Sequence, residues 1–239
     1  MATERIKKYL YKWEVEIDFL PNSHQYRINK KRIPSVTGIL NTINKPLLLP
    51  WAIMTMKDYL LEIDSITKED VIEASKQHTK KKTDAADIWT IIHDWIHNYI
   101  TNQEQALPES IEAKNWILWF LDWKEQHNVE FLESEKMVYS RKHNYVWYVD
   151  AICKINWNII IVDFKSSKWV YQEYHLQNAW YWIGIEEETW LDVAGTGILH
   201  FNKETWEFEF FTRNIRQYND DKDWFINCFW LFTYLKNNK

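Results

Sequence analysis

The stretch YVWYVDAICKINWNIIIVDFK, residues 145–165, decides the fold. Two apolar runs flank Asn156 and Trp157, which stand where a two-residue hairpin turn would lie. The stretch therefore predicts two antiparallel strands, near residues 145–154 and 158–165. Asp150 and Asp163 each lie six to seven residues from this turn. Their carboxylates should therefore lie at similar heights on neighbouring strands.

Two like charges at matching heights destabilise a sheet unless a cation compensates them. Asp163 and Lys165 lie two apart on one strand and so share a face. Carboxylate oxygens bind hard divalent cations, and a nearby lysine can orient an attacking water or neutralise a phosphate. We therefore expect both carboxylates to lie within about 5 Å of one cation position. Glu135, on the preceding predicted strand, is either a further ligand or an exposed strand charge.

The hydrophobic pattern predicts an α/β fold with a mixed central sheet flanked by helices. Helices are expected near 83–101 and 171–187, and strands near 133–139, 145–154, 158–165 and 193–201. No Pro, Gly or Ser-rich linker divides the 239 residues, so we expect one domain. It would comprise an N-terminal extension with a hairpin and helices (1–82), a core (83–212) and a C-terminal helix (213–239).

Four ordered motifs resemble the RecB-like, phage-type exonuclease branch of the PD-(D/E)XK nuclease superfamily. That family carries G-x-x-x-H on a helix, G-x-x-D and D-x-K on strands, and Q-x-x-x-Y on a second helix. The chain has Trp89 to His93, Trp147 to Asp150, Asp163 to Lys165 and Gln177 to Tyr181 at these places. His24-x-Tyr26 and the segment from Pro34 to Leu40 form a similar lead-in, so the resemblance covers roughly residues 24–212.

This resemblance implies an αβββαβ core and a metal-dependent, exonuclease-like deoxyribonuclease acting in phage or mobile-element recombination, repair or replication. It implies Mg²⁺ or Mn²⁺ as the cofactor, DNA as the partner, and a recombination or replication protein as a further partner. The implied metal ligands are Asp150, Asp163, the Phe164 carbonyl and, at a second metal position, His93. Lys165 is the implied catalytic lysine, Gln177 and Tyr181 lie beside the metal, and Ser166, Ser167 and Lys168 contact phosphate.

Charge and cysteine content narrow the function further. The net charge of −5 argues against a protein that coats nucleic acid nonspecifically, since phosphate binding needs Lys and Arg. Local basic patches could still contact DNA, or could simply be solvated: Arg27, Lys30, Lys31 and Arg32 form one, and Lys76, Lys80, Lys81 and Lys82 another. With two cysteines, the chain cannot hold the four-cysteine iron–sulfur cluster of some related nucleases. No apolar run is long enough to span a membrane, so we expect a cytoplasmic protein.

Two other functions remain open. His93 and His97 are spaced i, i+4 on a predicted helix, as in zinc hydrolases, but the usual Glu after the first His is absent. A DNA-binding or assembly protein that keeps the nuclease fold without its activity would carry the same pattern. Cleavage of linear DNA that is lost in Asp163→Ala would separate that alternative from an enzyme.

Tryptophan stands where the family pattern has glycine. The chain has 4 Gly and 16 Trp, whereas an average glycine content of about 7% would give roughly 17. We therefore hypothesise that a UGA codon for glycine has been read as tryptophan at Trp89, Trp147, Trp157, Trp169, Trp190 and Trp206. Core packing instead accounts for Trp51, Trp95, Trp119, Trp123, Trp224 and Trp230, which recur at helical spacing. An indole at Trp147 would narrow the cleft and lower the activity of the chain as written.

Overall fold

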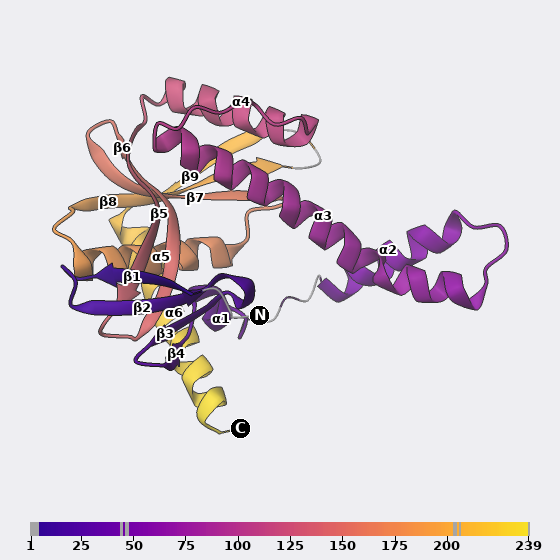
Figure 1. Ribbon diagram of the computed structural model, residues 1–239, viewed down its shortest axis with the longest axis horizontal. Coiled ribbons are helices and arrows are strands. Elements are labelled where there is room, and N and C mark those ends of the chain that lie inside the picture. Colours follow the sequence, from indigo (N-terminus) through magenta and orange to yellow (C-terminus); the bar gives the residue numbers. More distant parts are fainter. Residues whose placement is uncertain (1–4, 44, 46–47, 203–204, 206, 239) are drawn as a thin grey trace.

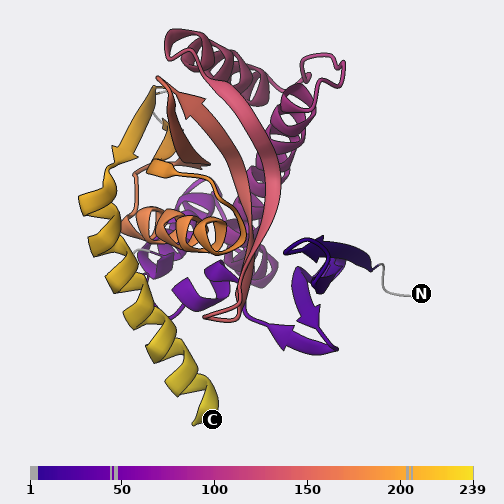
Figure 2. The same cartoon turned by 90° about the vertical axis from the view of Figure 1, so that its left-hand side faces the viewer.

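A five-stranded mixed sheet forms the centre of the computed structural model, which describes residues 5–43, 45, 48–202, 205 and 207–238 (Figure 1). Neighbouring strands follow chain order: β5 (Glu130–Ser140), β6 (Tyr145–Ile155), β7 (Asn158–Ser167), β8 (Val193–Asn202) and β9 (Phe208–Arg213). Only β7 and β8 pair in parallel within this sheet. Helices cover both faces (Figure 2). The predicted α/β class with a mixed central sheet is confirmed.

The β6–β7 hairpin has the predicted turn. Ile155 pairs with Asn158 across it, and Asn156 and Trp157 adopt left-handed φ angles of 47° and 70°. Positive φ at both central residues is the conformation that favours Asn-Gly. The register runs on to the pairing of Ala151 with Val162. One further step along this register sets Asp150 across from Asp163.

Two hydrophobic layers enclose the sheet. On one face α5 (Gln172–Glu188) packs with α1 (Val36–Leu40) and α6 (Ile215–Asn237), and Trp180 and Tyr181 are fully buried there. On the other face α3 (Lys68–Ile100) and α4 (Ile111–Gln126) pack against β6, β7 and β8 around Phe164. The predicted helix at 171–187 and the C-terminal helix are thus confirmed.

Helix α3 is much longer than predicted. It begins at Lys68 with a capping box between Thr67 and Asp70, fifteen residues before the predicted start. The region from residue 76 to 87 is largely polar, so its sequence gives no apolar stripe to follow. With α2 (Leu48–Leu61), the first half of α3 forms an arm that projects from the body (Figure 1). The expected boundary at residues 82 and 83 therefore falls inside one continuous helix.

A second, four-stranded antiparallel sheet lies at the N-terminus: β1 (Ile6–Leu10), β2 (Val15–Leu20), β3 (Gln25–Ile28) and β4 (Lys31–Ile33), with the 3-10 turn η1 (Pro21–Ser23) after β2. Its Ile17 and Tyr26 are buried in a cluster with Tyr139 of β5 and Val146 of β6. This sheet corresponds to the predicted N-terminal hairpin. Among the described residues, no helix is both long enough and apolar enough to cross a membrane.

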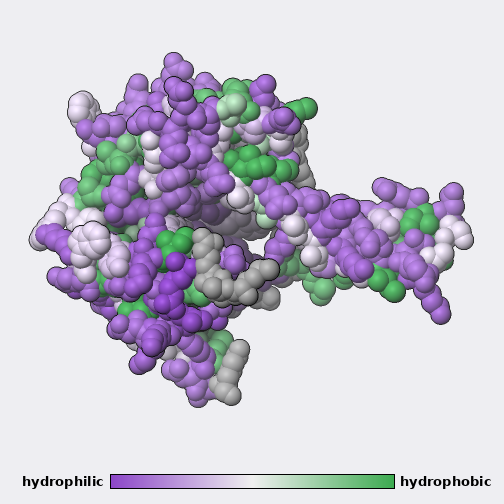
Figure 3. All heavy atoms as spheres, viewed as in Figure 1, coloured by the Kyte–Doolittle hydropathy of each residue, from purple (hydrophilic) through white to green (hydrophobic). Residues whose placement is uncertain are grey.

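The helical tryptophans are not all in the core. Trp123 is fully buried and Trp95 half-buried, but Trp51, Trp119, Trp224 and Trp230 are exposed. The expectation of core packing is therefore wrong for these four. Helical spacing shows that apolar residues share a face, but it does not show whether the body covers that face. On the arm, hydrophobic side chains accordingly appear among hydrophilic ones at the surface (Figure 3).

The tryptophans at suspected glycine positions differ among themselves. Trp157, Trp169 and Trp190 are exposed, and Trp157 stands at the tip of the β6–β7 hairpin, as expected. A glycine that follows a helix commonly adopts a left-handed φ, and Trp190, which follows α5, does not, so its backbone does not favour glycine. Trp89 and Trp147 are half-buried. Trp206, the remaining suspected glycine position, lies outside the described residues.

Candidate metal centre

A cleft of about 690 Å³ opens between α3, the middle of β5 and β6, the end of β7, and α5. Each of these elements contributes polar side chains to it. They are His93 and His97 from α3, Glu135 from β5, Asp150 from β6, Lys165 from β7, and Glu173 and Gln177 from α5. Residues that are distant in sequence therefore meet in one hollow, as the predicted strand order requires.

Three of these side chains could hold one cation. His93, Glu135 and Asp150 each offer a ligand atom, and these atoms lie within 4.8 Å of one another. His93 Nδ1 lies 3.3 Å from Glu135 Oε1, and His93 Nε2 lies 3.9 Å from Asp150 Oδ2. His93 Nε2 is buried and has no hydrogen-bond partner within the described residues. Each ring nitrogen of His93 thus faces one carboxylate, and an imidazole between two carboxylates fits a cation site.

Glu135 has an unusual backbone for a strand residue. Its φ is 50°, although its neighbours Ser134 and Lys136 pair regularly with Ala151 and Val149. A left-handed conformation costs a non-glycine residue roughly 1–2 kcal/mol. Such strain often accompanies function, and here the side chain reaches His93. The sequence left Glu135 undecided because strand alternation does not reveal a local left-handed turn.

Asp163 is the most deeply placed carboxylate. It is fully buried and forms an ion pair with Lys165, as expected for residues on one strand face. Gln177 donates a hydrogen bond of 3.4 Å to Asp163 Oδ1 and a second one to the Tyr181 hydroxyl. Gln177 and Tyr181 lie four residues apart on one face of α5. Both are buried, and this face points at Asp163. Asp163 is not a member of the three-residue group.

Phe164 connects the two parts of the site through its backbone. Its N–H donates a hydrogen bond of 2.8 Å to Asp150 Oδ2. Its carbonyl accepts one of 3.4 Å from Lys165 Nζ. The main-chain oxygen that was expected to bind the metal thus contacts Lys165 in this structure.

Burial and the neighbouring charges together set the pKa values of these groups. Burial raises the pKa of Asp163, Lys165 opposes that change, and Asp150 adds to it. Burial alone would lower the pKa of His93, but Asp150 and Glu135 outweigh it and raise the pKa. Asp163 and Asp150 likewise raise the pKa of Lys165 against the effect of burial. Carboxylates that each favour nearby positive charge would be stabilised by a bound cation.

Other predicted residues lie outside this group. His97 lines the cleft, but its Nδ1 lies 3.1 Å from Ser134 Oγ, and it does not join the possible metal ligands in the described part of the chain. Ser167 Oγ donates to the Trp169 carbonyl. The cleft lining includes neither Ser166 nor Lys168. Lys80, Lys81 and Lys82 are exposed on α3, with Lys82 about 16 Å along the helix from His93.

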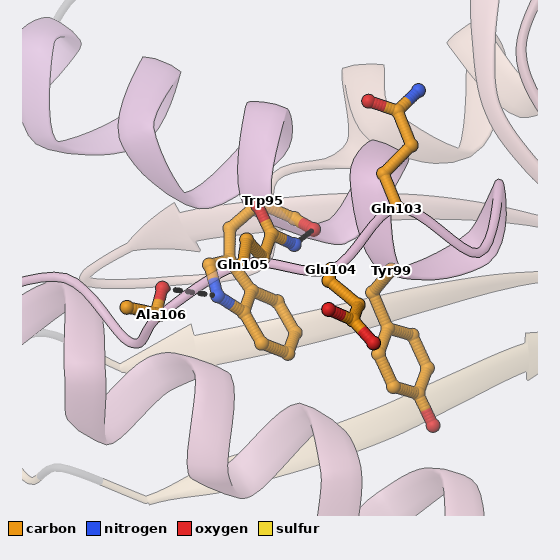
Figure 4. A pocket seen from close by; sticks show the side chains of 6 residues that line it. All are labelled: Trp95, Tyr99, Gln103, Glu104, Gln105 and Ala106. Atoms are coloured by element: carbon orange, nitrogen blue, oxygen red, sulfur yellow. Dashed lines mark hydrogen bonds between the residues drawn. The ribbon is translucent and has the colours of Figure 1, made fainter.

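A second hollow, of about 590 Å³, lies beside the end of α3 (Figure 4). Trp95 and Tyr99 stack there with ring centroids 5.4 Å apart. The Trp95 indole donates a 3.1 Å hydrogen bond to the Ala106 carbonyl, which fixes the loop after the helix. Glu104 lines this hollow, and Lys124 Nζ lies 6.0 Å from the centre of the Tyr99 ring. The acidic and basic side chains that could hold a metal together line the His93 cleft instead.

No protein-family model matches this chain, and no curated protein is significantly similar to it. The functional assignment therefore rests on the residues and geometry of the cleft.

Proposed function

We propose that this chain is a metal-dependent DNA nuclease with a PD-(D/E)XK-type core. One observation carries the proposal: His93, Glu135, Asp150 and Lys165 converge in one cleft, with Asp163 beneath them. The order of α3, β5, β6, β7, α5 and β8 also agrees with an αβββαβ core. Together with the four sequence motifs, this supports phosphodiester hydrolysis over a purely structural role for these charges.

The proposed cofactor is Mg²⁺ or Mn²⁺. His93, Glu135 and Asp150 would hold it, and Lys165 of the same cleft contacts both Asp163 and the Phe164 carbonyl. Oxygen-rich ligands suit these hard cations, and one imidazole suits Mn²⁺ in particular. A bound cation would supply Lewis acidity and lower the pKa of a water. The spare electron pairs of a buried His93 Nε2 and of three carboxylates fit this role.

The remaining residues would prepare the reaction. Lys165 lies at the cleft with its ammonium held by Asp163, so it is placed to orient a water or to neutralise charge that develops on a phosphate. Lys165 contacts one oxygen of the Asp163 carboxylate, Oδ2, and Gln177 donates a hydrogen bond to the other, Oδ1. The preorganised Lys165 therefore needs little rearrangement when a phosphate enters.

The proposed substrate is DNA, cleaved from free ends in phage or mobile-element recombination, repair or replication. Lys80, Lys81 and Lys82 lie on the helix that carries His93, so a DNA backbone could run along α3 into the cleft. Three lysines contacting phosphates would make binding fall with added salt. A recombination or replication protein is the proposed further partner.

The decisive experiment offers end-labelled linear DNA and closed circular DNA to the purified chain with Mg²⁺, Mn²⁺ or EDTA. We expect metal-dependent loss of the label from linear DNA. Asp163→Asn should abolish this loss, and Asp192→Asn, which makes the same change at an exposed site, should not. Calorimetric titration with Mn²⁺ should show binding that Asp150→Asn weakens, and circular dichroism should show that each variant folds.

The outcome that contradicts the proposal is equally specific. A folded wild-type chain that binds DNA and yet cleaves neither substrate with either metal would support the inactive DNA-binding alternative. Cleavage that persists in Asp163→Asn would point to a contaminant or to another site. Trp89 and Trp147 line the cleft, so slow cleavage by the chain as written agrees with the proposal.

A further inference from the structure

Helix α6 carries a second apolar face that the body does not cover. Its inner face packs on α5 through Tyr218 and Phe225, both buried. No charged residue occurs from Trp224 to Leu235. The exposed apolar residues there are Trp224, Trp230, Leu231, Tyr234 and Leu235, which we call the α6 stripe. A helix that is apolar on all sides is normally buried on all sides.

The α6 stripe runs along one side of the helix, and the exposed polar Asn227 lies between Trp224 and Leu231 on that side. Trp224, Leu231 and Leu235 are spaced i, i+7 and i+11, and Trp230 and Tyr234 run beside them one turn apart. These five side chains are 45–66% exposed. Because an aromatic side chain presents roughly 150–250 Å², the stripe exposes on the order of 600 Å², the upper end for a monomer surface. An exposed apolar area of this size is expected to be covered by a partner.

We propose that the α6 stripe is the interface of a symmetric homodimer. Two stripes together would bury about 1,200 Å², the lower limit for a stable protein interface. An uncharged stripe offers no charge for a different partner to complement, whereas a two-fold axis places the stripe against its own copy. The C-terminal end of α6 projects beyond the body, which leaves room for a second molecule (Figure 2).

This interface is independent of the proposed nuclease function. Helix α6 covers the sheet face opposite α3, which carries His93. Two copies joined along α6 would therefore keep both clefts open. Cys228 packs at the flank of the stripe, close to its midpoint, and is partly exposed, whereas Cys153 is fully buried. In an antiparallel pair the two Cys228 side chains would come near each other.

Sedimentation velocity of the full chain, from low to high micromolar concentration, tests the interface. We expect a monomer–dimer equilibrium. The double variant Leu231→Glu, Leu235→Glu should weaken the dimer affinity at least tenfold, since like charges that face each other in an interface are strongly unfavourable. Leu49→Glu, at an exposed apolar residue of the arm, should leave the equilibrium unchanged. A short bismaleimide should cross-link the wild type, and Cys228→Ser should remove the cross-link.

Three results would overturn the proposal. The wild type could remain a monomer at the highest concentration. A dimer could survive the stripe variant while Leu49→Glu breaks it, which would place the contact on the arm. Cross-linking could also persist in Cys228→Ser. The cross-link is formed on the wild-type chain, in which the stripe is not mutated. It therefore tests the interface even if the glutamate variant fails to fold.

Discussion

The Asp150 carboxylate accepts a 2.8 Å hydrogen bond from the backbone N–H of Phe164. This bond joins β6 to β7 within the Asp163-Phe164-Lys165 triplet, and Asp150 Oδ2 also faces His93. One side chain therefore has a structural role and a place in the candidate metal centre. The two roles can be separated, because an amide can accept the hydrogen bond but is a poorer ligand for a hard cation.

Asp150→Asn should keep the stability of the fold and weaken metal binding, whereas Asp150→Ala should lower both. Alanine leaves the buried Phe164 N–H without an acceptor, which costs about 1–3 kcal/mol of the free energy of unfolding. Urea denaturation without metal measures the first effect, and Mn²⁺ titration measures the second. Equal stability of the two variants would show that the hydrogen bond contributes nothing.

Removing the lysine of the buried ion pair should destabilise the protein strongly. Lys165→Met leaves the fully buried Asp163 without its cation, and breaking such a pair costs roughly 3–5 kcal/mol. The double variant Lys165→Met, Asp163→Asn should recover most of that loss, because no uncompensated charge remains. Urea denaturation of the three proteins tests this, and a double variant as unstable as Lys165→Met would contradict it.

The fold around β6 and β7 could be predicted because its signals are local. The Asn156-Trp157 turn and the apolar runs on each side set the strand pairing, and that pairing placed Asp150 beside Asp163. The ion pair of Lys165 followed from strand alternation. Gln177 and Tyr181 are spaced i, i+4, which places both on one face of a helix, and in the structure Gln177 contacts both Tyr181 and Asp163.

Other features depend on tertiary structure and could not be predicted. The start of α3 lies in a polar stretch that another helix supports, so hydrophobic periodicity missed it. The ligand role of Glu135 depends on a left-handed backbone within a strand. Trp224 and Trp230 recur at core-like spacing, yet they lie on the uncovered side of α6. Periodicity describes one helix, whereas burial depends on what packs against it.

Glu135→Gly should stabilise the metal-free protein while it weakens metal binding. Glycine adopts a φ of 50° without strain, so the free energy of unfolding should rise by about 1 kcal/mol. Loss of one carboxylate should lower Mn²⁺ affinity by about tenfold or more. Glu133→Gly, two residues earlier on β5 and outside the metal group, is the matched control and should not gain stability. A stability loss in Glu135→Gly would mean that the strand needs the side chain.

Stability should fall in acid partly because of His175. Burial, with a contribution from Arg213, lowers its pKa to about 4 from 6.5, so the folded state keeps the ring neutral. The unfolded chain takes up a proton first, so this contribution is complete above pH 6.5 and is lost as pH falls from 6.5 towards 4. The loss amounts to at most about 3 kcal/mol. His175→Asn should flatten the stability profile in this window, and an unchanged slope would contradict the assignment.

Two tryptophans stand in backbone conformations that suit glycine. Trp13 and Trp157 have φ angles of 76° and 70° and are 76% and 87% exposed. A left-handed φ costs a residue with a side chain roughly 1–2 kcal/mol, and an exposed indole gains little from packing. Trp13→Gly and Trp157→Gly should therefore each raise the free energy of unfolding by about 1 kcal/mol. Trp123→Gly, in the buried core, should instead lower it by about 3–5 kcal/mol.

Peptide masses of the protein from its natural source would test the glycine-codon hypothesis directly. We expect glycine at Trp13 and Trp157, because both residues adopt a left-handed backbone and both rings remain largely exposed beside their neighbours Tyr9 and Lys154. Trp89 and Trp147 are half-buried against Trp116 and Tyr26, so they fit either residue. If they are also glycine, Trp89→Gly with Trp147→Gly should widen the cleft and raise the rate of DNA cleavage. Tryptophan at both turns in the natural protein would refute recoding, and the strained turns would then be native.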